Sequence, residues 1–589
     1  MYSESEFIRP ISWRLKRGHL LREKAFDKVN TEKRDIFCFF DLRRQQIRLV
    51  MADASLIQKS RLGLVDIPDD ISFPDLILQR ATEYGNRTAL IDAQTDVTMT
   101  YAELRDNILR AASSLYERGL RKAEVTLIIS NNHVLFPVAC YAVTYLGGIA
   151  STVNPHYTTE ELRYMVEDTS CSRIITQSPL INKVQRAVRG YTGLQEILLL
   201  DSKDGYTSLK ELIDSGNPKF VSPVRINPVQ DIAFLPYSSG TTGRSKGVML
   251  SHYNLIANMY QDMHPSVVFG VHHPETFIVF LPFYHIYALS TIMSLGLIQG
   301  DILVVIEKYN LQLYMNCIYR YKATLLHMVP PVALQLAKAN KSKNFMASVH
   351  TIFCGAAPLG PDVERSVLQR TGISTFRQGY GLTETSSTSH IAPVKHWKHG
   401  SCGLLLPNTE CKVRDLETNE ALGPNKDGEI LLRGPQIMKG YWRRPISTAN
   451  AIDAKGWFHT GDIGHYDEDG HFYIVDRLKE LIKWKALQVP PAEIEEVLLK
   501  HPAVADVAVI GISDKEAGEV PRAYVVVKRG VKVTEKDIID FVTARVAPHK
   551  KLRGGVQFIA EIPKSPSGKI LRRILRGMMV EKQSYAAKL

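Results

Sequence analysis

The chain has 589 residues, more than a single hydrophobic core serves, so at least two domains are expected. Its composition, 45% hydrophobic and 23% charged, is that of a folded soluble protein and excludes a largely disordered chain. The net charge of +12 lies at the ends: residues 1–50 carry twelve Lys and Arg against seven Asp and Glu, and residues 550–589 carry ten against two. The body is therefore close to neutral, which argues against a nucleic-acid-binding protein.

The seven cysteines are scattered and form no CxxC pair. The sequence therefore predicts neither a zinc site nor a disulfide framework, and it fits a reducing intracellular compartment.

The N-terminal part has no apolar core of the kind found in a signal peptide. A mitochondrial presequence is an alternative, but the seven acidic residues among the first fifty argue against it. Met51 is a plausible alternative start. We interpret residues 1–60 as a basic extension, of which the first fifty residues are expected to take no part in the fold.

From about residue 70 to residue 470, short apolar runs alternate with amphipathic segments. A helix is predicted in the amphipathic segment YTTEELRYMVEDT, where a Thr precedes Glu160 and Glu161 as a candidate N-cap. This alternation predicts an α/β domain with largely parallel sheets. Five apolar runs are predicted to be buried strands: residues 125–130, 173–178, 197–201, 302–307 and 324–329.

The stretch SSGTTGRSKG, from Ser238 to Gly247, follows the apolar run at residues 232–237. Its glycines let backbone amides approach phosphate oxygens, and its hydroxyls and cations can solvate a polyphosphate. The Walker pattern requires a hydroxyl residue directly after its Lys, whereas Gly247 follows Lys246 here. The loop is therefore predicted to hold phosphates in a protein that is not a P-loop NTPase.

The uncharged stretch from Phe277 to Ile298 is long enough to span a bilayer. It contains Pro282, His285 and several hydroxyl residues, and we interpret it as buried core. No transmembrane segment is predicted.

Three later stretches carry candidate nucleotide-binding groups: CGAAPLG at 354–360, QGYGLTET at 378–385 and WFHTGDIG at 457–464. The first offers space for a flat ring against its backbone. In the second, Tyr380 could stack on a base while Glu384 holds a divalent cation on phosphate oxygens. In the third, Asp462 could accept both hydroxyls of a ribose.

A second, smaller domain is predicted after a charged break at residues 475–485. Beyond the break the pattern restarts with a helix at 491–500, strands at 504–512 and 523–529, and a helix from about residue 535 to residue 546. This is a compact unit of about 100 residues.

Together these motifs, with SPSGK at 565–569, resemble those of the AMP-forming acyl-CoA synthetases, which also include coumarate–CoA ligases, insect luciferases and peptide-synthetase adenylation domains. The likeness runs from Ile71 to Arg573 and is strongest to the coumarate–CoA ligase-like and fatty acyl-CoA synthetase branch. It implies an α/β fold: a large domain of doubly wound sheets with a β-barrel-like subdomain at 61–476, a hinge at 477–480, and a small mobile α+β domain at 481–589.

The resemblance also implies ATP, Mg²⁺ and coenzyme A as reactants or cofactors, and it assigns roles to individual residues. Thr383 and Glu384 would meet the α-phosphate and Mg²⁺, and Asp462 with Arg477 would hold the ribose. The phosphate loop would use Ser238, Ser239, Gly240, Thr241, Thr242, Gly243 and Lys246. The adenine would be lined by Gly355, Ala356 and Tyr380, and the same nucleotide site would include Gln378, Gly379 and Gly381.

The chemistry implied by the resemblance has two steps. Lys569 would bridge the substrate carboxylate and the α-phosphate while an acyl-adenylate forms. The small domain would then rotate about Lys479 so that coenzyme A attacks the adenylate. His285 matches the family's gate beside the acyl tunnel, and Lys483 and Gln488 match positions tied to the adenylate.

The sequence departs from the family at two places. Ala486 stands where most relatives have Gly, and we expect this methyl group to slow the thioester step without abolishing it. The coumarate ligases follow their Thr-Glu pair with Ala-Gly-Pro-Val, whereas this chain has polar residues at 385–390.

We therefore expect a medium- or long-chain or functionalised fatty acid ahead of a hydroxycinnamate. Its pocket would include Tyr287, Thr291 and Ser386. A hydroxylated or internally polar chain would satisfy their hydroxyls, which a plain alkyl chain would leave unpaired; the alternative is that the serines face water or cap the backbone. The alternatives are a coumarate-type aryl-CoA ligase, a luciferase-like oxygenase, and a non-catalytic relic that binds acyl-adenylate or coenzyme A.

The last three residues, Ala587, Lys588 and Leu589, resemble the SKL peroxisomal address. They predict recognition by the peroxisomal import receptor and location in the peroxisome, with the cytoplasm and the mitochondrion as alternatives.

Overall fold

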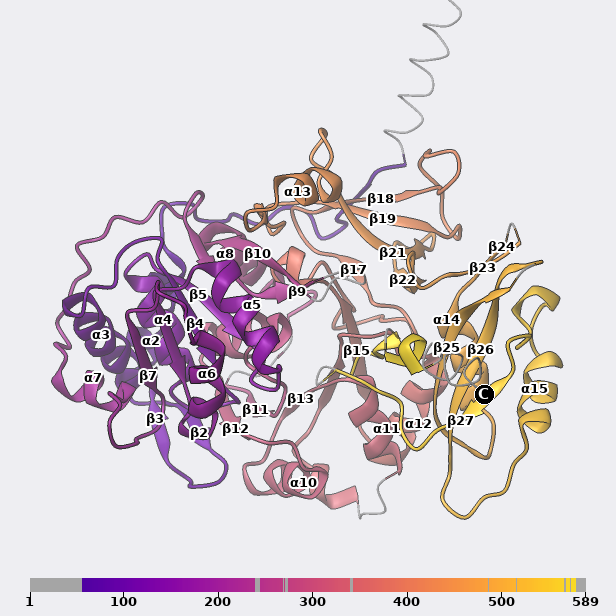
Figure 1. Cartoon of the computed structure of the whole chain (residues 1–589), viewed down its shortest axis with the longest axis horizontal. Coiled ribbons are helices and arrows are strands. Elements are labelled where there is room, and N and C mark those ends of the chain that lie inside the picture. Colours follow the sequence, from indigo (N-terminus) through magenta and orange to yellow (C-terminus); the bar gives the residue numbers. More distant parts are fainter. Residues whose placement is uncertain are drawn as a thin grey trace, which may run out of the picture. The chain divides into compact units, whose positions relative to one another are not determined.

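The computed structural model describes residues 56–238, 244–268, 270, 274–338, 343–485, 487–514, 516–565, 568–572 and 574–578. Residues 1–55 of the predicted N-terminal extension and the C-terminal tripeptide lie outside the described residues. Within the predicted extension, β1 (Gln58–Lys59) pairs with β18 (Glu410–Arg414), so this end of it takes part in the fold. The described residues fold into four β-sheets with helices packed on them (Figure 1).

The first sheet carries the phosphate loop and has the strand order β20-β10-β8-β5-β4-β6-β7, with β9 paired to β10. Strands β4 to β8 pair in parallel, whereas β9, β10 and β20 pair antiparallel. The bounds are β4 (Val125–Ile129), β5 (Ile149–Val153), β6 (Arg173–Thr176), β7 (Glu196–Leu199), β8 (Ile232–Phe234), β9 (Tyr237–Ser238), β10 (Lys246–Ser251) and β20 (Gly440–Tyr441). The three strands predicted for this region are confirmed as β4, β6 and β7.

The second sheet has the order β17-β16-β15-β14-β13-β11-β12-β2-β3 and a parallel centre from β15 to β2. Its central strands are buried because helices cover both of its faces. The bounds are β2 (Thr88–Asp92), β3 (Thr98–Thr100), β11 (Thr276–Val279), β12 (Ile302–Val305), β13 (Leu325–Met328), β14 (Thr351–Cys354), β15 (Thr375–Tyr380), β16 (His390–Ile391) and β17 (Leu404–Leu405). The two predicted strands here are confirmed as β12 and β13.

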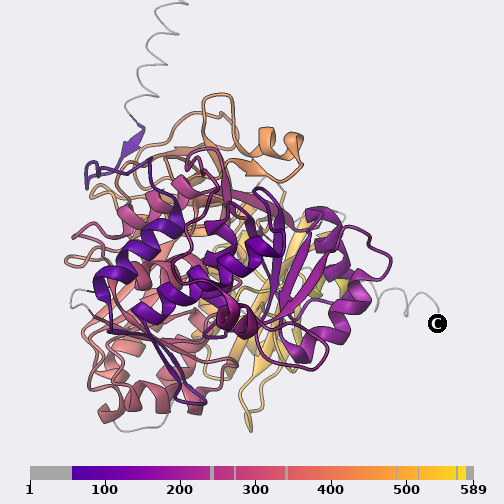
Figure 2. The ribbon, with the colours of Figure 1, turned by 90° about the vertical axis from the view of Figure 1, so that its left-hand side faces the viewer.

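The helices between residues 73 and 262 lie between the strands of these two sheets in the chain. Figure 2 shows the most N-terminal of these helices in indigo, facing the viewer. The predicted N-cap is confirmed, because Thr158 and Glu161 form a reciprocal capping box at the start of α5. The bounds are α2 (Phe73–Tyr84), α3 (Tyr101–Glu117), α4 (Phe136–Tyr145), α5 (Thr159–Thr169), η1 (Ser178–Leu180), α6 (Ile181–Val188), α7 (Leu209–Ser215) and α8 (His252–Asp262).

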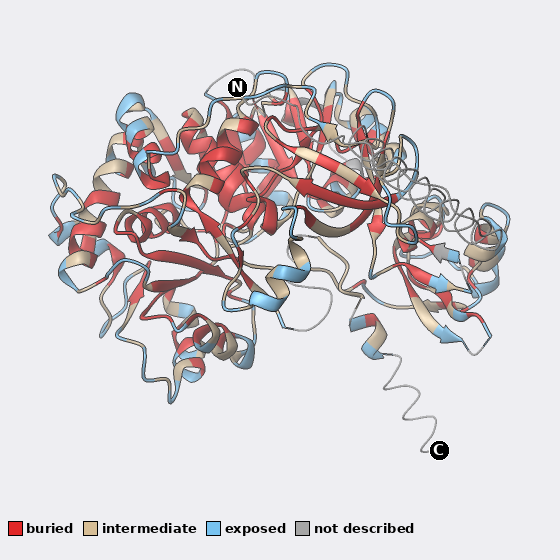
Figure 3. Cartoon of the chain, turned by 90° about the horizontal axis from the view of Figure 1, so that it is seen from above, coloured by how far each residue is buried: buried red, intermediate tan, exposed pale blue. Residues whose placement is uncertain are grey.

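The uncharged stretch at residues 277–298 is buried core, as predicted. It continues from β11 into a π-helical segment and then into a short α-helix, and its residues are almost all buried. Figure 3 colours the buried residues of the chain red. Within the described residues, no helix is long and apolar enough to cross a membrane. The next helices along the chain are η2 (Tyr287–Ser294), α9 (Leu295–Gln299), α10 (Leu311–Arg320), α11 (Pro330–Lys338), η3 (Lys343–Met346), α12 (Pro361–Thr371) and η4 (Thr383–Thr385).

The third sheet is antiparallel and supplies the barrel-like part of the large domain, orange in Figure 1. Its order is β1-β18-β19-β21-β22, and its long strand β21 carries the TGD motif. The bounds are β1 (Gln58–Lys59), β18 (Glu410–Arg414), β19 (Gly428–Arg433), β21 (Phe458–Tyr466) and β22 (Phe472–Arg477), with helix α13 (Pro445–Ala451) leading into it.

The fourth sheet belongs to the small domain and has the order β24-β23-β26-β25, with β27 on β26. Two hydrophobic clusters, drawn only from residues between Ile482 and Leu575, form its core. The bounds are β23 (Ile482–Trp484), β24 (Leu487–Val489), α14 (Pro491–Leu499), β25 (Val504–Asp514), β26 (Gly518–Val527), α15 (Glu535–Thr543), η5 (Pro548–Lys550) and β27 (Val556–Phe558). The predicted elements are confirmed, although α15 ends three residues earlier than expected.

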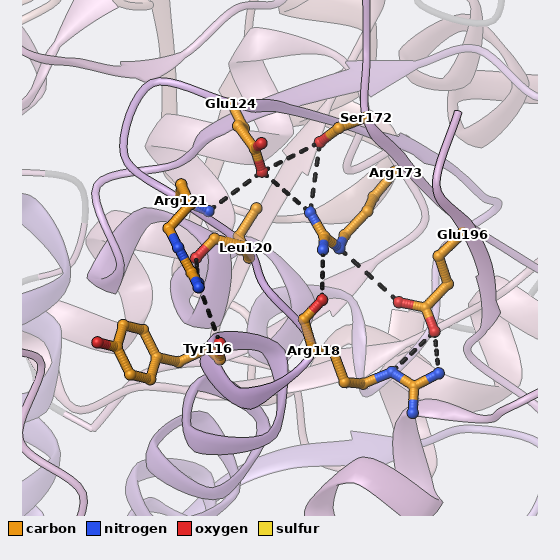
Figure 4. A network of polar contacts seen from close by, with 8 residues as sticks. All are labelled: Tyr116, Arg118, Leu120, Arg121, Glu124, Ser172, Arg173 and Glu196. Carbon is orange, nitrogen blue, oxygen red and sulfur yellow. Dashed lines mark hydrogen bonds and ion pairs between the residues drawn. The ribbon is translucent and has the colours of Figure 1, made fainter. Parts of the chain in front are cut away.

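A buried guanidinium ties together the strands of the first sheet at the edge where β4, β6 and β7 begin (Figure 4). Arg173 is 1% exposed and pairs with Glu124 at 3.0 Å and with Glu196 at 3.7 Å. It also donates to the carbonyl of Arg118, at the end of α3, at 2.7 Å. This network fixes the amino-terminal edge of the sheet, whereas ligands of such sheets bind at the opposite, carboxyl edge.

Candidate active site

The phosphate loop is held at both ends by paired strands. Ser238 closes β9 and Lys246 opens β10, and the two residues are direct antiparallel partners. The loop connects them as a hairpin, which brings its two ends to the same place. Its middle residues, Ser239, Gly240, Thr241, Thr242 and Gly243, lie outside the described residues.

Glu384 points its carboxylate at the start of this loop. It lies on η4, beside Thr383, and its side chain is buried. Its Oε1 atom accepts a hydrogen bond from the Ser238 hydroxyl at 2.8 Å and a second from the Tyr441 hydroxyl at 2.9 Å. Because both of these bonds reach Oε1, Oε2 is the oxygen left to face a ligand.

This carboxylate suits the Mg²⁺ ion that the resemblance implies. Mg²⁺ is commonly held by one or two carboxylates together with substrate phosphates, and it keeps several waters. Within the described residues there is no group of three or more His, Cys, Asp or Glu that could form an all-protein metal site. Glu384, next to the phosphate loop, therefore fits an ion that arrives with its nucleotide.

The nucleoside part of the site lies where β14 and β15 end. Gly355 and Ala356 follow β14 directly, and Ala356 has a φ of 70°, which is unusual for a residue with a side chain. Gln378, Gly379 and Tyr380 are the last residues of β15. The two ends are adjacent because β14 and β15 pair in parallel. The structure thus brings together these predicted nucleotide-site residues.

The GYG motif needs its second glycine for a close backbone approach. A Cβ atom at Gly381 would stand 1.7 Å from the carbonyl oxygen of Ser387. Any side chain at Gly381 would push the loop at residues 386–389, the pocket loop, away from the end of β15.

Asp462 is the centre of a buried polar group at the predicted ribose position. Its Oδ2 accepts from the Tyr380 hydroxyl at 2.7 Å, and its Oδ1 pairs with the Arg477 Nε at 3.0 Å. Asp462 on β21 and Arg477 on β22 are direct strand partners, which fixes this pair. Burial, reinforced by the Asp462 charge, raises the pKa of Tyr380, so its hydroxyl stays protonated and keeps donating.

Lys569 of the small domain lies within electrostatic reach of this group. Burial and the Arg477 guanidinium lower the pKa of Lys569 to about 8, against the opposing pull of the Asp462, Glu480 and Glu384 carboxylates. The pKa of His285 is lowered to about 4, first by burial and then by the charge of Lys569. Lys569 is therefore within electrostatic reach of His285, Glu384 and Asp462, and its role in the reaction stays a prediction.

The other small-domain residues lie elsewhere. Lys483 is exposed on β23, opposite Gln488 of β24, whose side chain is not described. The backbone N–H of Lys483 donates to Glu519 of its own domain at 2.8 Å. Among the contacts of the described residues, none joins Lys483 to Glu384 or Asp462. Lys479, the predicted hinge, lies in the turn between β22 and β23, and its role stays a prediction.

The pocket hydroxyls have partners inside the protein. Tyr287 shares a hydrogen bond of 3.1 Å with His327, and Thr291 shares one of 2.6 Å with Ser387. Ser386 donates to the backbone carbonyl of Gln436 at 2.8 Å. An apolar chain would therefore not leave these hydroxyls without a partner, and the reason given for a polar group on the substrate is contradicted. Ser386 instead binds the backbone, which was the alternative that the sequence left open.

Ala486, whose methyl group was expected to slow the thioester step, lies outside the described residues. That expectation, like the domain boundaries at 61–476 and 481–589, stays a prediction.

Tyr441, which donates to Glu384, is a site residue that was not predicted from the sequence. This contact joins residues 57 positions apart, and Tyr441 stands in a short strand without a periodic apolar pattern. In the sequence, the only local sign is the glycine that precedes it. In the structure this glycine, Gly440, has a φ of 138°.

Comparison with known families gives a consistent result. The AMP-binding enzyme family matches residues 77–442, and the AMP-binding enzyme C-terminal domain matches residues 493–569. The 4-coumarate–CoA ligase 2 of Nicotiana tabacum is 36% identical over 533 residues, which cover 89% of this chain and 97% of that protein. The 4-coumarate–CoA ligase 4 of Arabidopsis thaliana is 37% identical over 544 residues, covering 89% and 94%.

The fold is also shared with solved structures. The crystal structure of ATP-bound MatB from Rhodopseudomonas palustris superposes with a TM-score of 0.79 at 27% identity, over 86% of this chain and 99% of that chain. The superposition spans both the large and the small domain of the chain.

Proposed function

The chain belongs to the AMP-binding enzyme family and is an ATP-dependent, AMP-forming acid–thiol ligase, and we propose that its acid is a medium- or long-chain fatty acid. The family and the reaction class follow from the matches to both domains. The choice of acid is the proposal.

The reaction divides into two displacements. The substrate carboxylate attacks the α-phosphorus of ATP, pyrophosphate leaves, and an acyl-adenylate forms. The thiol of coenzyme A then attacks the acyl carbon and AMP leaves. In the first displacement an anion approaches an anionic phosphorus, so positive charge near the reacting atoms lowers the barrier.

We assign the residues of this site as follows. The Lys569 ammonium, close to Glu384 and Asp462, neutralises the charge that builds up between carboxylate and phosphate. Asp462 and Arg477 orient the ribose, and the loop that ends at Lys246 receives the leaving pyrophosphate. Glu384 would hold Mg²⁺, which supplies further neutralisation of phosphate charge when bound.

The observation that carries the choice of acid is the Thr291–Ser387 hydrogen bond at 2.6 Å. Both side chains are buried, and the bond commits one of their two hydroxyl protons to a partner inside the protein. A phenolic hydroxyl brought to this place would therefore meet fewer available partners, and it would lose its water at about 1–3 kcal/mol if it gained none. An alkyl chain carries no such cost.

A coumarate-type aryl acid is the second candidate. It is favoured by the similarity to 4-coumarate–CoA ligases at 36% and 37% identity over nearly their whole length. The Tyr287 hydroxyl, already bonded to His327, is the group that a phenol would have to engage.

The two candidates are separated by comparing kcat/KM for decanoate, 10-hydroxydecanoate and coumarate with the same purified chain. We expect decanoate to be preferred over coumarate by about tenfold, the size of one unpaired polar group. We also expect the hydroxylated chain to be no better than decanoate. A preference for coumarate of tenfold or more would overturn the proposal and leave the aryl acid.

A variant makes this test sharper. Thr291→Val deletes the hydroxyl while keeping the branched shape, and it frees the Ser387 hydroxyl. If the Thr291–Ser387 bond excludes phenols, this variant should gain activity on coumarate relative to decanoate. Loss of activity on both acids in equal proportion would show that the bond serves folding only.

We also propose that the protein resides in peroxisomes, on the strength of Ala587, Lys588 and Leu589. A fluorescent protein fused ahead of the intact C-terminus should enter peroxisomes, and one fused after Leu589 should not. Delivery of a fusion of residues 1–50 to mitochondria would support the competing location.

A further inference from the structure

Tyr441 sits on a strand fixed directly beside the phosphate loop. It belongs to β20, where it pairs with Val248 of β10, two residues after Lys246. The next residue, Trp442, donates its backbone N–H to the carbonyl of Gly247 at 2.8 Å. The backbone position of Tyr441 is thus set by the strand that leaves the loop.

The same segment is also tied to the element that carries Glu384. The backbone N–H of Met438 donates to the Glu384 carbonyl at 2.9 Å, and the Tyr441 hydroxyl donates to the Glu384 carboxylate at the same distance. The segment from Met438 to Tyr441 therefore connects β10 to η4 through hydrogen bonds. One of these bonds, from the Tyr441 hydroxyl, reaches the Glu384 carboxylate.

Local packing leaves this segment little freedom. A Cβ atom at Gly440 would lie 2.6 Å from the Thr448 side chain, and the Thr448 hydroxyl accepts from the Tyr441 N–H at 2.9 Å. Glycine lets the chain pass close to α13 and aim the next side chain inward.

The ring of Tyr441 faces the cation of the loop. The Lys246 ammonium lies 4.9 Å from the ring centroid, a distance at which an aromatic face attracts a positive charge. One side chain therefore contacts both charged groups that the phosphates would meet: a cation through its ring and a carboxylate through its hydroxyl.

The Tyr441 hydroxyl is one of two donors to the same carboxylate oxygen. With Ser238 also donating to Oε1, the carboxylate cannot rotate without losing two hydrogen bonds, and Oε2 stays directed away from both donors.

We propose that Tyr441 is a positioning residue that holds the Glu384 carboxylate and the Lys246 ammonium in register for a metal-bound triphosphate, an inference that rests on the proposed function. Groups that orient a metal ligand commonly affect metal affinity about 10- to 100-fold when they are removed. Tyr441 does not touch the reacting atoms, so its effect should fall on metal and nucleotide binding and on adenylation.

The variant that tests this is Tyr441→Phe, which deletes the hydroxyl but keeps the ring over Lys246. Binding of Mn²⁺ to the full chain with α,β-methylene-ATP, an analogue that cannot be cleaved there, is followed by electron paramagnetic resonance. We expect the Mn²⁺ dissociation constant to rise about tenfold or more. Formation of acyl-CoA from supplied acyl-adenylate should stay within about twofold of wild type.

Tyr237→Phe is the matched control. Tyr237 lies on the neighbouring strand β9, and its hydroxyl also donates to a carboxylate, that of Asp168, at 2.7 Å. It has no hydrogen bond to Glu384 among the described residues. Its variant loses an equivalent bond and should keep the wild-type Mn²⁺ affinity.

The Ser238→Ala variant deletes the second donor to Oε1. If orientation of the carboxylate is what matters, it should weaken Mn²⁺ binding in the same direction as Tyr441→Phe. A binding constant within twofold of wild type for Tyr441→Phe would overturn the inference, as would an equal loss in Tyr237→Phe.

These outcomes are separate from those of the proposed function. A wild-type chain that binds Mn²⁺ and the analogue but makes no acyl-adenylate would contradict the function, while the comparison of Mn²⁺ affinities among the variants would still decide the role of Tyr441.

Discussion

At the scale of single residues, the site depends on charges held in a partly buried place. Lys569 is the clearest case, because burial and Arg477 lower its pKa to about 8. A lysine with an ordinary pKa would stay charged well above that pH. The charged form of Lys569 is the one that can neutralise the negative charge on the α-phosphate while the adenylyl group is transferred.

The adenylation half-reaction of the wild type should therefore lose rate as pH rises through about 8, since Lys569 then loses its proton. Lys569→Ala should be slower by roughly 10²-fold or more, the cost of a missing positioned donor, and should lack this alkaline limb. Pyrophosphate release measured from pH 6 to pH 9.5 shows both effects.

The thioester half-reaction is the control for this residue. Supplied acyl-adenylate should still react with coenzyme A in Lys569→Ala at close to the wild-type rate. If both half-reactions fall equally, Lys569 has a structural role or acts in both steps, and its assignment to adenylation is contradicted.

The motifs themselves indicated Glu384 and Asp462 as nucleotide-binding groups, and the resemblance to the acyl-CoA synthetases implied Arg477 and Lys569 as members of the same site. Their motifs are local, and the structure places the four within reach of one another. The Tyr441–Glu384 and Thr291–Ser387 contacts could not be predicted, because each joins residues distant in sequence through the packing of separate elements. A sequence pattern carries no information on which of several hydroxyls finds a protein partner.

At the scale of elements, the pocket loop at residues 386–389 rests on a buried carboxyl group. Asp262, at the end of α8, accepts from the Thr388 hydroxyl at 2.6 Å. Burial raises the pKa of Asp262 to about 8, despite that hydrogen bond, so the folded protein holds this group protonated at neutral pH. The loop above it carries positive φ angles at Ser386 and Ser387, a conformation that costs free energy in residues with a side chain.

A raised carboxyl pKa makes stability depend on pH in a definite direction. Below the ordinary pKa of about 3.9 the proton is bound in both states, and its contribution to stability is fully present. As pH rises toward about 8 the unfolded state gives up the proton more readily, so this contribution is lost. Asp262→Asn stays neutral throughout and should lack the dependence.

We therefore expect the melting temperature of the wild type to fall relative to that of Asp262→Asn as pH rises from 5 to 8.5. Thermal unfolding of both proteins at several pH values provides the comparison. Parallel melting curves across this range would show that Asp262 is ionised in the folded protein and would contradict the argument.

The elements that sequence predicted best are those with a strong local pattern. The central strands β4, β6, β12 and β13 are short apolar runs between polar segments, and α5 has a reciprocal capping box. The short strands β9 and β20 have two residues each and owe their pairing to β10. The π-helical turn at η2 follows from packing in an apolar stretch, which has no period that separates it from an α-helix.

In the whole molecule, two lysines of the small domain lie in different places, Lys569 near the large-domain site and Lys483 on the exposed surface of its own sheet. We interpret this arrangement as the one that suits adenylation. Rotation of the small domain would then be needed before coenzyme A reacts.

Attack of the carboxylate on the α-phosphorus of ATP can be followed with an acid that carries ¹⁸O in its carboxylate, incubated with the full chain, ATP, Mg²⁺ and coenzyme A. We expect one ¹⁸O atom in the AMP, unlabelled pyrophosphate, and acyl-CoA in equal amount. Appearance of ADP, with the ¹⁸O in inorganic phosphate, would place the attack on the γ-phosphorus and contradict this expectation.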